Sequence, residues 1–245
     1  MRSAAIWGPR IESEEYWISI SDLMAGLMAI FLFIAISYML NIKQILDEVQ
    51  GVATSYDSVR VKIYEALQQE FRDDLAKWGA ELDPSLVVRF NEPEVLFEQS
   101  SDALQPMFRE ILDDFFPRYV AILTREEFRD EVSEVRIEGH TSSEWRTETG
   151  QLQAYLNNMD LSQARTSNVL SYVLQQERVR SESDWVRSKV ISIGFSSSRP
   201  SLLDDGSEDL DASRRVDFQV MTKAQERLEE IMRKGEGSFL RGGAG

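Results

Sequence analysis

Apolar residues gather in one long stretch near the start of the chain. From Leu23 to Leu40 no side chain is charged. Counted from Trp17, the stretch is long enough to cross about 30 Å of hydrocarbon as a helix that rises about 1.5 Å per residue. Its length, a single acid inside it (Asp22) and the lack of an Ala-x-Ala site after it favour a retained helix over a cleaved signal peptide. The pattern predicts a polar tail over residues 1–16 and a membrane-spanning helix over residues 17–40.

A second period begins where the apolar stretch ends. Apolar residues recur at alternating steps of three and four, the a/d pattern of a coiled coil, at Ile42, Ile45, Val49, Val52, Tyr56, Val59, Ile63 and Ala66. The seam then shifts to Leu67, Phe71, Leu75 and Trp78. The pattern predicts a helical linker over residues 41–79 that pairs with a second copy as a parallel coiled coil. The alternative is one amphipathic helix that packs on its own domain.

The remaining chain alternates strand-like and helix-like segments. Short apolar runs predict strands at 86–90, 95–97, 135–139, 190–195 and 215–220. Helical periodicity predicts one helix capped by Ser100–Asp102 and continuing past Pro117. A polar loop from Thr141 to about Gly150 is followed by a long helix that covers at least 161–176, and a short turn is predicted at Trp185. This alternation predicts an α/β sandwich over residues 82–221, with helices on one face of a mixed sheet. Residues 222–245 are expected to form a charged helix and a flexible tail.

Composition excludes several classes of function. The formal net charge of the 245 residues is −15, which argues against a nucleic-acid partner because phosphate binding needs a basic face. Cysteine is absent, so neither a disulfide nor a cysteine metal site can form. The lone histidine, His140, makes a histidine-based metal site improbable. We therefore expect no metal and no cofactor.

Asp22 is the first candidate for chemistry. A carboxylate at membrane depth costs roughly 2.5–3.5 kcal/mol on insertion scales, so it normally faces a partner or a water path. The alternative is that Asp22 lies at the headgroup boundary and caps the helix after Ser19 and Ser21. Ala25 and Gly26 narrow one helix face, which suits close packing on another helix and favours the first reading.

The same segment resembles the single membrane helix of the MotB family. The residues that carry the resemblance are Trp17, Asp22, Met24, Met28, Phe31 and Phe33. The gap from Trp17 to Asp22 is one residue shorter than in flagellar MotB. The resemblance implies that Asp22 carries ions, with protons favoured over sodium, and that Ser19 and Ser21 are candidates to support the ion path.

The MotB resemblance also implies partners and a location. The expected partners are a second copy, as a parallel dimer, and a ring of MotA-like multi-span subunits in the bacterial inner membrane. The Lys and Arg count on the two sides of the helix is nearly balanced, so it does not set the orientation. A cytoplasmic N-terminus and a periplasmic C-terminal domain follow from the resemblance alone.

Residues 82–221 resemble the OmpA-like peptidoglycan-binding domain. The resemblance is spread over Val95–Phe97 with Ser100, Leu104 and Pro106; Ile137–Thr141; Asn158, Leu161, Ser162 and Arg165; and Gly194, Phe195, Pro200 and Ser213–Val216. It implies that Arg165 holds a diaminopimelate carboxylate through a two-pronged hydrogen bond. It also implies that Asn158, Leu161, Thr141 and Ser142 border the same site. The alternative for Arg165 is a surface ion pair, and this alternative is favoured for Arg214 and Arg215.

One position departs from the OmpA-like pattern. The family normally has aspartate directly after the threonine, where it holds the diaminopimelate ammonium, but Ser142 stands here. A serine cannot supply that charge, so wall binding is expected to be weakened or altered unless Glu144 or Asp160 replaces it. Ser142 beside His140 does not indicate a hydrolase, because no oriented acid or nucleophile elbow accompanies them. His140 is expected to be a histidine at the end of a strand whose ring nitrogens are hydrogen-bonded. We expect no enzyme activity.

The chain most resembles the ZorB-type stator subunits of the Zorya anti-phage defence system. The features that carry this resemblance are the serine-flanked Ser21–Met24 segment, the acidic tail and the length. This resemblance implies a single-span, wall-anchored subunit of an ion-driven rotary motor with a ZorA-like partner ring. The alternatives are a flagellar or other MotB-like stator and, from another class, a passive peptidoglycan tether that moves no ions.

Overall fold

A computed structural model describes residues 12–98, 101–145 and 150–226; the side chains of residues 12–16, 18–19, 45, 47–57 and 93 lie outside the description. Helix α1 spans Glu12–Phe71. The chain divides into two compact units, Met1–Gly51 and Val52–Gly245, and each is described by itself. The predicted charged helix at 222–234 and the tail lie mostly outside the described residues.

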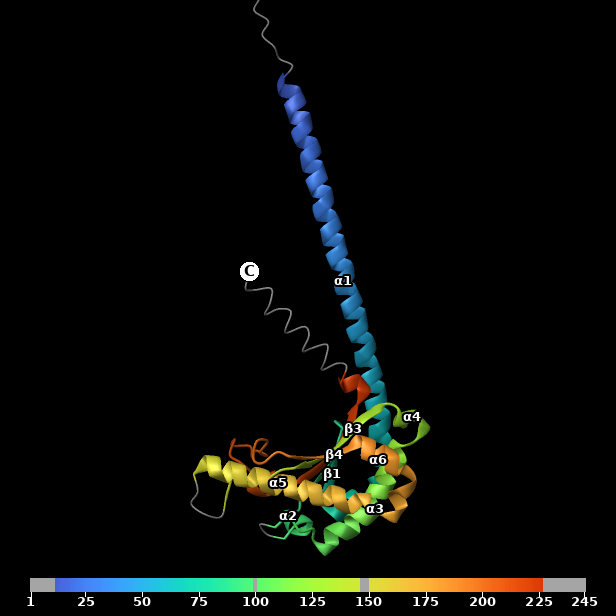
Figure 1. The fold of residues 1–245 in the computed structure, drawn as a ribbon, viewed down its shortest axis with the longest axis vertical. Helices are drawn as coiled ribbons and strands as arrows, with labels where there is room; N and C mark the ends of the chain where they lie inside the picture. Colours follow the sequence, from blue (N-terminus) through green and yellow to red (C-terminus); the bar gives the residue numbers. More distant parts are fainter. Residues whose placement is uncertain (1–11, 99–100, 146–149, 227–245) are drawn as a thin grey trace, which may run out of the picture. The chain divides into compact units, whose positions relative to one another are not determined.

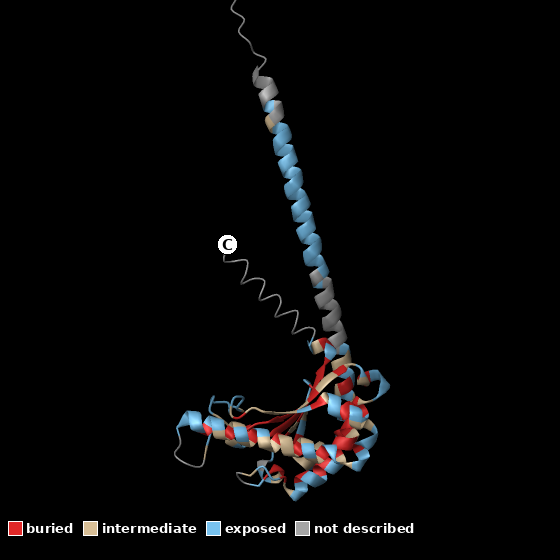
Figure 2. Cartoon of the chain, in the orientation of Figure 1, coloured by how far each residue is buried: buried red, intermediate tan, exposed pale blue. Residues whose placement is uncertain are grey.

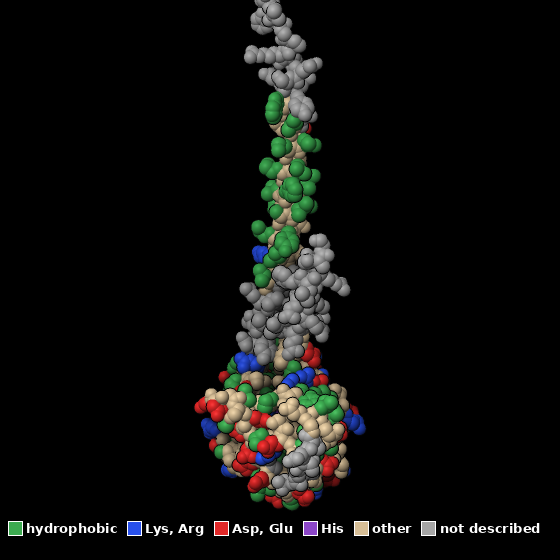
Figure 3. All heavy atoms as spheres, turned by 90° about the vertical axis from the view of Figure 1, so that its left-hand side faces the viewer, with side chains coloured by type: hydrophobic (Ala, Val, Ile, Leu, Met, Phe, Trp, Pro, Cys, Tyr) green, Lys and Arg blue, Asp and Glu red, His purple; other side chains and the backbone are tan. Residues whose placement is uncertain are grey.

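The first unit contains the apolar helix that the sequence predicts. Ile20–Gln44 has a mean hydropathy of 2.4 and is long and apolar enough to cross a membrane. Its side chains are mostly exposed, as the pale blue helix in Figure 2 and the hydrophobic side chains along it in Figure 3 show. Phe31 is 62% exposed and Phe33 is 74% exposed. Because none of the described residues covers these apolar groups, their natural surroundings are expected to be lipid or another protein.

The last turns of α1 belong to the core of the second unit. Ile63, Leu67 and Phe71 are fully buried, and Val59 and Ala66 pack against the same core. From Val59 onward, the predicted coiled-coil seam therefore faces this chain's own domain, which corrects the prediction of a two-stranded coil for that part. For residues 42–56 the coiled coil stays a prediction.

Helix α1 ends earlier than the sequence suggests. It ends at Phe71, and a short 3-10 helix η1, Leu75–Trp78, leads to Gly79 in the left-handed conformation with φ 58°. A Cβ at Gly79 would lie 2.4 Å from the Glu92 side chain, so glycine fits both the conformation and the space. The next residues form strand β1, Ala80–Asp83, which the sequence analysis missed because the run is only four residues long and two of them are acidic.

Five strands form one mixed sheet in the order β1-β2-β5-β3-β4. The other strands are β2 Val87–Phe90, β3 Val132–Gly139, β4 Val190–Gly194 and β5 Val216–Thr222. Strands β3 and β4 run parallel, while β1–β2, β2–β5 and β5–β3 are antiparallel. The predicted mixed sheet is confirmed, and β5 reaches Thr222, where a helix was predicted to begin.

The two faces of the sheet have different chemistry. Along β5, Val216, Phe218 and Val220 enter the hydrophobic core, whereas Asp217 and Gln219 alternate with them. The core face is covered by α3 Pro106–Leu123, α5 Gln151–Leu174 and α6 Ser183–Lys189, which lie around the strands in Figure 1. Short elements α4 Glu126–Arg129, η2 Glu177–Glu182 and α7 Leu210–Ser213 complete the described domain.

Two local predictions are corrected. Val95–Phe97 is not a strand: α2 spans Pro93–Leu96, and Phe97 makes only an isolated bridge to Leu104. The Ser-Asp segment does not cap α3, which begins at Pro106; instead the Ser101 hydroxyl accepts from the Ala103 N–H. Helix α5 begins at Gln151, directly after the predicted polar loop, which confirms the long helix predicted there, although it ends at Leu174 and not at Gln176. The predicted extension of α3 past Pro117 is confirmed.

Candidate functional site

The carboxylate of Asp22 is exposed on α1, near one end of the apolar span Ile20–Gln44. In the described part of the chain it has no hydrogen-bond or ion-pair partner. Ser21 is also exposed, and the Ser19 side chain lies outside the described residues. Gly26, one turn further on, has no atom within 4 Å of an added Cβ, so this narrow face is open in the isolated chain. Any partner for Asp22 must come from outside these residues.

A pocket lies in the second unit where β3 ends and β5 begins. Its lining residues are Leu96, Phe97, Gly139, His140, Arg165, Arg214, Arg215 and Val216. Four of the eight carry nitrogen-rich side chains, and none is acidic. The pocket is therefore suited to an anionic group.

Arg165 is the guanidinium in this pocket without a counter-ion. It lies on α5, its Nε donates to the Ser101 carbonyl at 2.9 Å, and its guanidinium carbon lies 4.7 Å from the centre of the Phe97 ring. Burial and the nearby charge of Arg214 lower the pKa of Arg165 to about 10, which Asp102 only partly offsets. Among the described residues no carboxylate lies within ion-pair distance of Arg165. At neutral pH the group stays charged, and its forked Nη donors are available to a ligand.

The other two arginines are already paired. Arg214 forms an ion pair with Asp211. Arg215 donates to Asp217 at 3.2 Å and to the Arg199 carbonyl at 3.2 Å. Burial lowers the pKa of Arg215, and Asp217 only partly opposes this. The ion pairs favoured by the sequence for these two residues are present, whereas the ion-pair alternative for Arg165 is not seen in the described residues.

The other predicted residues gather in the loop after β3. The Asn158 amide donates to the carbonyls of Ser142 at 3.1 Å and Glu144 at 3.2 Å, so it holds the backbone of this loop in place. Thr141 and Ser142 are buried, and the Thr141 hydroxyl oxygen has no hydrogen-bond partner among the described residues. Leu161 is half-buried on α5 and is not among the pocket-lining residues. The structure thus places Arg165 in the pocket and Thr141, Ser142 and Asn158 together beside its His140 edge.

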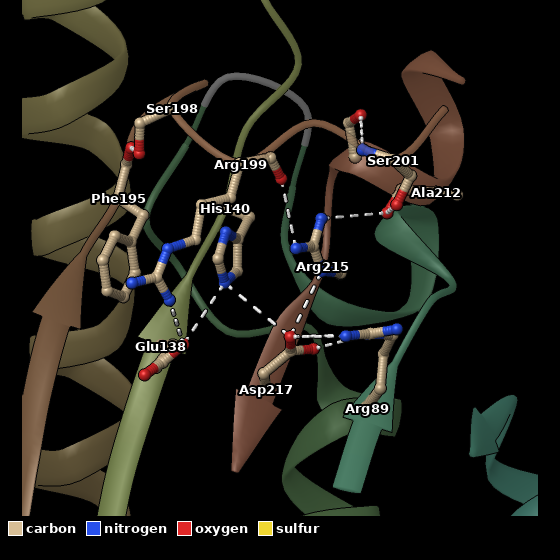
Figure 4. Close-up of polar contacts among 11 residues, drawn as sticks. Arg89, Glu138, His140, Phe195, Ser198, Arg199, Ser201, Ala212, Arg215 and Asp217 are labelled. Atoms are coloured by element: carbon tan, nitrogen blue, oxygen red, sulfur yellow. Dashed lines mark hydrogen bonds and ion pairs between the residues drawn. The ribbon is translucent and has the colours of Figure 1, made fainter. Parts of the chain in front are cut away.

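Next to the pocket is a row of charges that the sequence analysis did not identify. Strand pairing sets Arg89 opposite Asp217, and Asp217 opposite Glu138 (Figure 4). Arg89 donates to Asp217 at 3.1 Å, and Arg199 lies 3.4 Å from Glu138. Burial tends to lower the pKa of Arg89, but its hydrogen bond to Asp217 and the Asp217 charge outweigh this and raise it. These acids and bases are far apart in sequence, so only the strand order could have revealed the row.

His140 sits in the middle of this row. Its Nε2 lies 3.7 Å from both Glu138 and Asp217, and its ring stacks on Phe195 at 5.2 Å. Neither ring nitrogen has a hydrogen-bond partner in the described structure. The expectation of a satisfied histidine at the strand end is therefore wrong in its hydrogen bonding, although the ring is buried as expected.

The fold, Asp22 on α1 and the arginine-lined pocket together define a class of protein. In the described residues it has a membrane-length helix and an α/β domain that carries a cationic pocket. The chain is 45% identical over 224 residues to the Zorya protein ZorB of Escherichia coli, an alignment that covers 91% of this chain and 94% of that protein. The chain belongs to the ZorB family. No protein-family model matches it.

Three solved structures illustrate the similarity of the fold. A MotB-like protein from Desulfovibrio vulgaris matches with a TM-score of 0.49 and 20% identity over 68% of this chain and 96% of that one. The cell wall anchor of the type VI secretion system from Pseudomonas aeruginosa matches with a TM-score of 0.43 and 21% identity, covering 64% and 97%. The periplasmic domain of Helicobacter pylori MotB matches with a TM-score of 0.42 and 17% identity, covering 65% and 90%.

Proposed function

We propose that this chain is the single-span, wall-anchored subunit of an ion-driven rotary motor in the bacterial inner membrane, acting in anti-phage defence. Membership of the ZorB family supports the defence role over a flagellar stator. The proposed wall binding is supported by the Arg165 guanidinium. It is held in the pocket by contacts with Ser101 and Phe97, and it lacks a carboxylate partner in the described residues. The N-terminus faces the cytoplasm and the pocket faces the wall.

In the wall-binding step, Arg165 receives a carboxylate of a diaminopimelate side chain. The guanidinium fork offers two parallel N–H groups to the two carboxylate oxygens. The repulsion between Arg165 and Arg214, which contributes to the lowered pKa, is relieved when an anion arrives between them. Anchoring then holds the subunit stationary.

In the ion-carrying step, Asp22 takes a proton from the periplasmic side and releases it inward. Protonation removes the charge and lets the carboxyl cross an apolar interface, and ionisation draws it back to a polar one. Two copies in a parallel dimer bring two Asp22 side chains into a ring of ZorA-like multi-span subunits, which turns around the fixed dimer. Ser19 and Ser21 support the ion path, and the open face at Gly26 receives the partner helix.

A second function, a passive wall tether, is favoured by one observation. Asp22 is the third residue of the apolar span, close to where a helix-capping carboxylate at the headgroup boundary would lie. In that case the same pocket binds the wall, and Asp22 moves no ions.

Co-sedimentation of the full-length protein with purified peptidoglycan sacculi tests the anchor. Arg165→Lys keeps the charge but loses the fork, and Arg165→Ala loses both, so we expect binding to weaken on the order of tenfold or more in each. Arg187→Ala is the matched control, because Arg187 is exposed on α6 and its ion-pair partner among the described residues is the exposed Asp184. Sacculus binding by Arg165→Ala equal to that of the wild type overturns the anchor.

A further inference from the structure

The lining of the pocket can pair with the carboxylate of an amino-acid group, but it contains no anion to pair with the ammonium. Its lining residues include three arginines and no acid. The terminal group of a diaminopimelate side chain carries a carboxylate and an ammonium on one carbon, so its recognition also needs an anion close to the arginine. Ser142, which stands where this anion is expected, is buried and uncharged.

A different carboxylate lies against the same loop. Glu208 accepts a hydrogen bond from the Ser143 N–H at 3.0 Å and another from the Ser143 hydroxyl. Ser143 is three residues from His140, which lines the pocket, so its Cα lies within about 11 Å of that of His140. Glu208 is thus fixed beside the position where the aspartate is missing.

The backbone around Glu208 makes this placement firm. Glu208 forms a bridge with Leu202, and the turn between them closes through Gly206, whose φ of 82° suits glycine. One residue later, the Asp209 carboxylate caps α7 by accepting from the Asp211 and Ala212 N–H groups. Helix α7 then leads directly to Arg214 and Arg215 in the pocket. One segment therefore carries both Glu208 and two pocket arginines.

The carboxyl charge of Glu208 is not used inside the described structure. Its partners there are neutral donors, and no described Lys, Arg or His lies within ion-pair distance. Nearby, the buried Thr141 hydroxyl oxygen also lacks a hydrogen-bond partner in the described part of the chain. By contrast, Glu144 and Asp160 are exposed, and no described contact fixes either carboxylate. Asp160 also lies roughly opposite the buried Asn158 on the α5 surface, because two residues turn a helix by about 200°.

We propose that Glu208 replaces the missing aspartate and binds the ammonium group of the wall ligand whose carboxylate is held by Arg165. This assignment rests on the proposed wall-binding function. It makes Glu208 a specificity-determining residue: Arg165 supplies affinity for any carboxylate of suitable reach, and Glu208 selects those that carry an adjacent ammonium.

Calorimetric titration of the full-length protein in detergent with two synthetic wall-stem peptides tests this assignment. One peptide carries meso-diaminopimelate, and the other carries 2-aminopimelate, which keeps the side-chain carboxylate but lacks the ammonium beside it. We expect the wild type to prefer the diaminopimelate peptide by about tenfold or more, and Glu208→Gln to bind both equally. Glu144→Gln is the matched control and should keep the preference. Ser142→Asp added to Glu208→Gln should restore it, which a purely structural role of Glu208 would not allow.

The outcomes separate the two proposals. If Glu208→Gln keeps the wild-type preference, or loses both peptides equally without rescue by Ser142→Asp, the role of Glu208 is overturned while the wall-binding function stands. If the wild type binds neither peptide nor sacculi, the wall-binding function fails and the role of Glu208 fails with it.

Discussion

Two phenylalanines show how differently the two units of this chain are completed. Phe31 in the apolar helix is 62% exposed, whereas Phe71 near the end of α1 is fully buried against Trp78 and Phe115. The second unit buries its apolar groups within the chain. The first unit leaves its apolar side chains uncovered by the described residues. The second unit is therefore a self-contained domain, whereas the first is expected to be completed by lipid or by a partner protein.

Asp217 in the second unit and Asp22 in the first differ in the same way as the two phenylalanines. Asp217 is buried and held by Arg89 and Arg215, so its charge is used within the fold. Asp22 has no partner in the described residues, and neither Arg nor Lys lies near it in the sequence of its helix. The charge of a paired buried acid is compensated within the fold, whereas an unpaired acid in an apolar helix indicates a function performed with a partner.

Truncating the two phenylalanines should give the largest difference in stability. Phe71→Ala removes a ring packed on two others and should lower the free energy of unfolding of the domain by about 3–5 kcal/mol. Phe31→Ala should leave that free energy unchanged. Urea unfolding of the full chain in detergent, followed by tryptophan fluorescence, measures both. Equal loss in the two variants would mean that the helix segment also packs on the domain.

Adding one methyl group to a glycine in each unit gives a smaller contrast. At Gly194 a Cβ would lie 2.5 Å from the Gln163 backbone nitrogen, so Gly194→Ala should cost about 1–3 kcal/mol by overpacking. At Gly26 nothing lies within 4 Å, so Gly26→Ala should not change the unfolding of the isolated chain. It should instead weaken co-purification with the multi-span partner. Unchanged co-purification would show that the Gly26 face is not a contact.

The smallest expected effect concerns the join between α1 and the domain. Arg118 pairs with Glu70 at 2.8 Å and with Asp74 and Asp114 at 3.0 Å, and its guanidinium carbon lies 5.0 Å from the Phe71 ring centre. Because the group is partly exposed, Arg118→Ala should cost only about 1–2 kcal/mol at pH 7. Arg72→Ala, at an exposed neighbour, should cost almost nothing.

This effect should depend on pH. The hydrogen bond from Lys77, together with Arg118, lowers the pKa of Asp74 below its usual 3.8 despite opposing desolvation. A lowered carboxyl pKa stabilises the fold above the unfolded value and loses that contribution as the pH falls through the folded value. The difference between wild type and Arg118→Ala in urea midpoint should therefore be smaller at pH 3 than at pH 7. A constant difference would assign the effect to the packing of Arg118 on Phe71.

Sequence patterns predicted what depends on local periodicity. The charge-free run from Leu23 to Leu40 required a membrane-length helix, and the runs at 135–139 and 190–195 were strands. The pattern could not tell whether Ile63 faces a second copy or its own domain, because both surroundings select the same apolar spacing. Only tertiary packing decides that question.

The site was predictable only in part for a similar reason. Arg165 could be named because it stands in a recognisable motif on one helix. The contact between Ser143 and Glu208 joins positions 65 residues apart, and the Arg89–Asp217 pair joins positions 128 apart. Residues so far apart produce no recognisable local sequence pattern. Their contacts can therefore be predicted only when the order of the strands is known.

The central claim, that Asp22 carries ions for a defence motor, is tested most directly by phage plating on cells that carry the intact gene neighbourhood. Asp22→Asn keeps the shape and removes the titratable charge, and Ser37→Ala in the same helix is the matched control. With membrane levels and partner association unchanged, we predict that wild type and Ser37→Ala protect against phage and that Asp22→Asn plates like cells without the system. Full protection by Asp22→Asn would contradict the claim and leave the chain a passive tether.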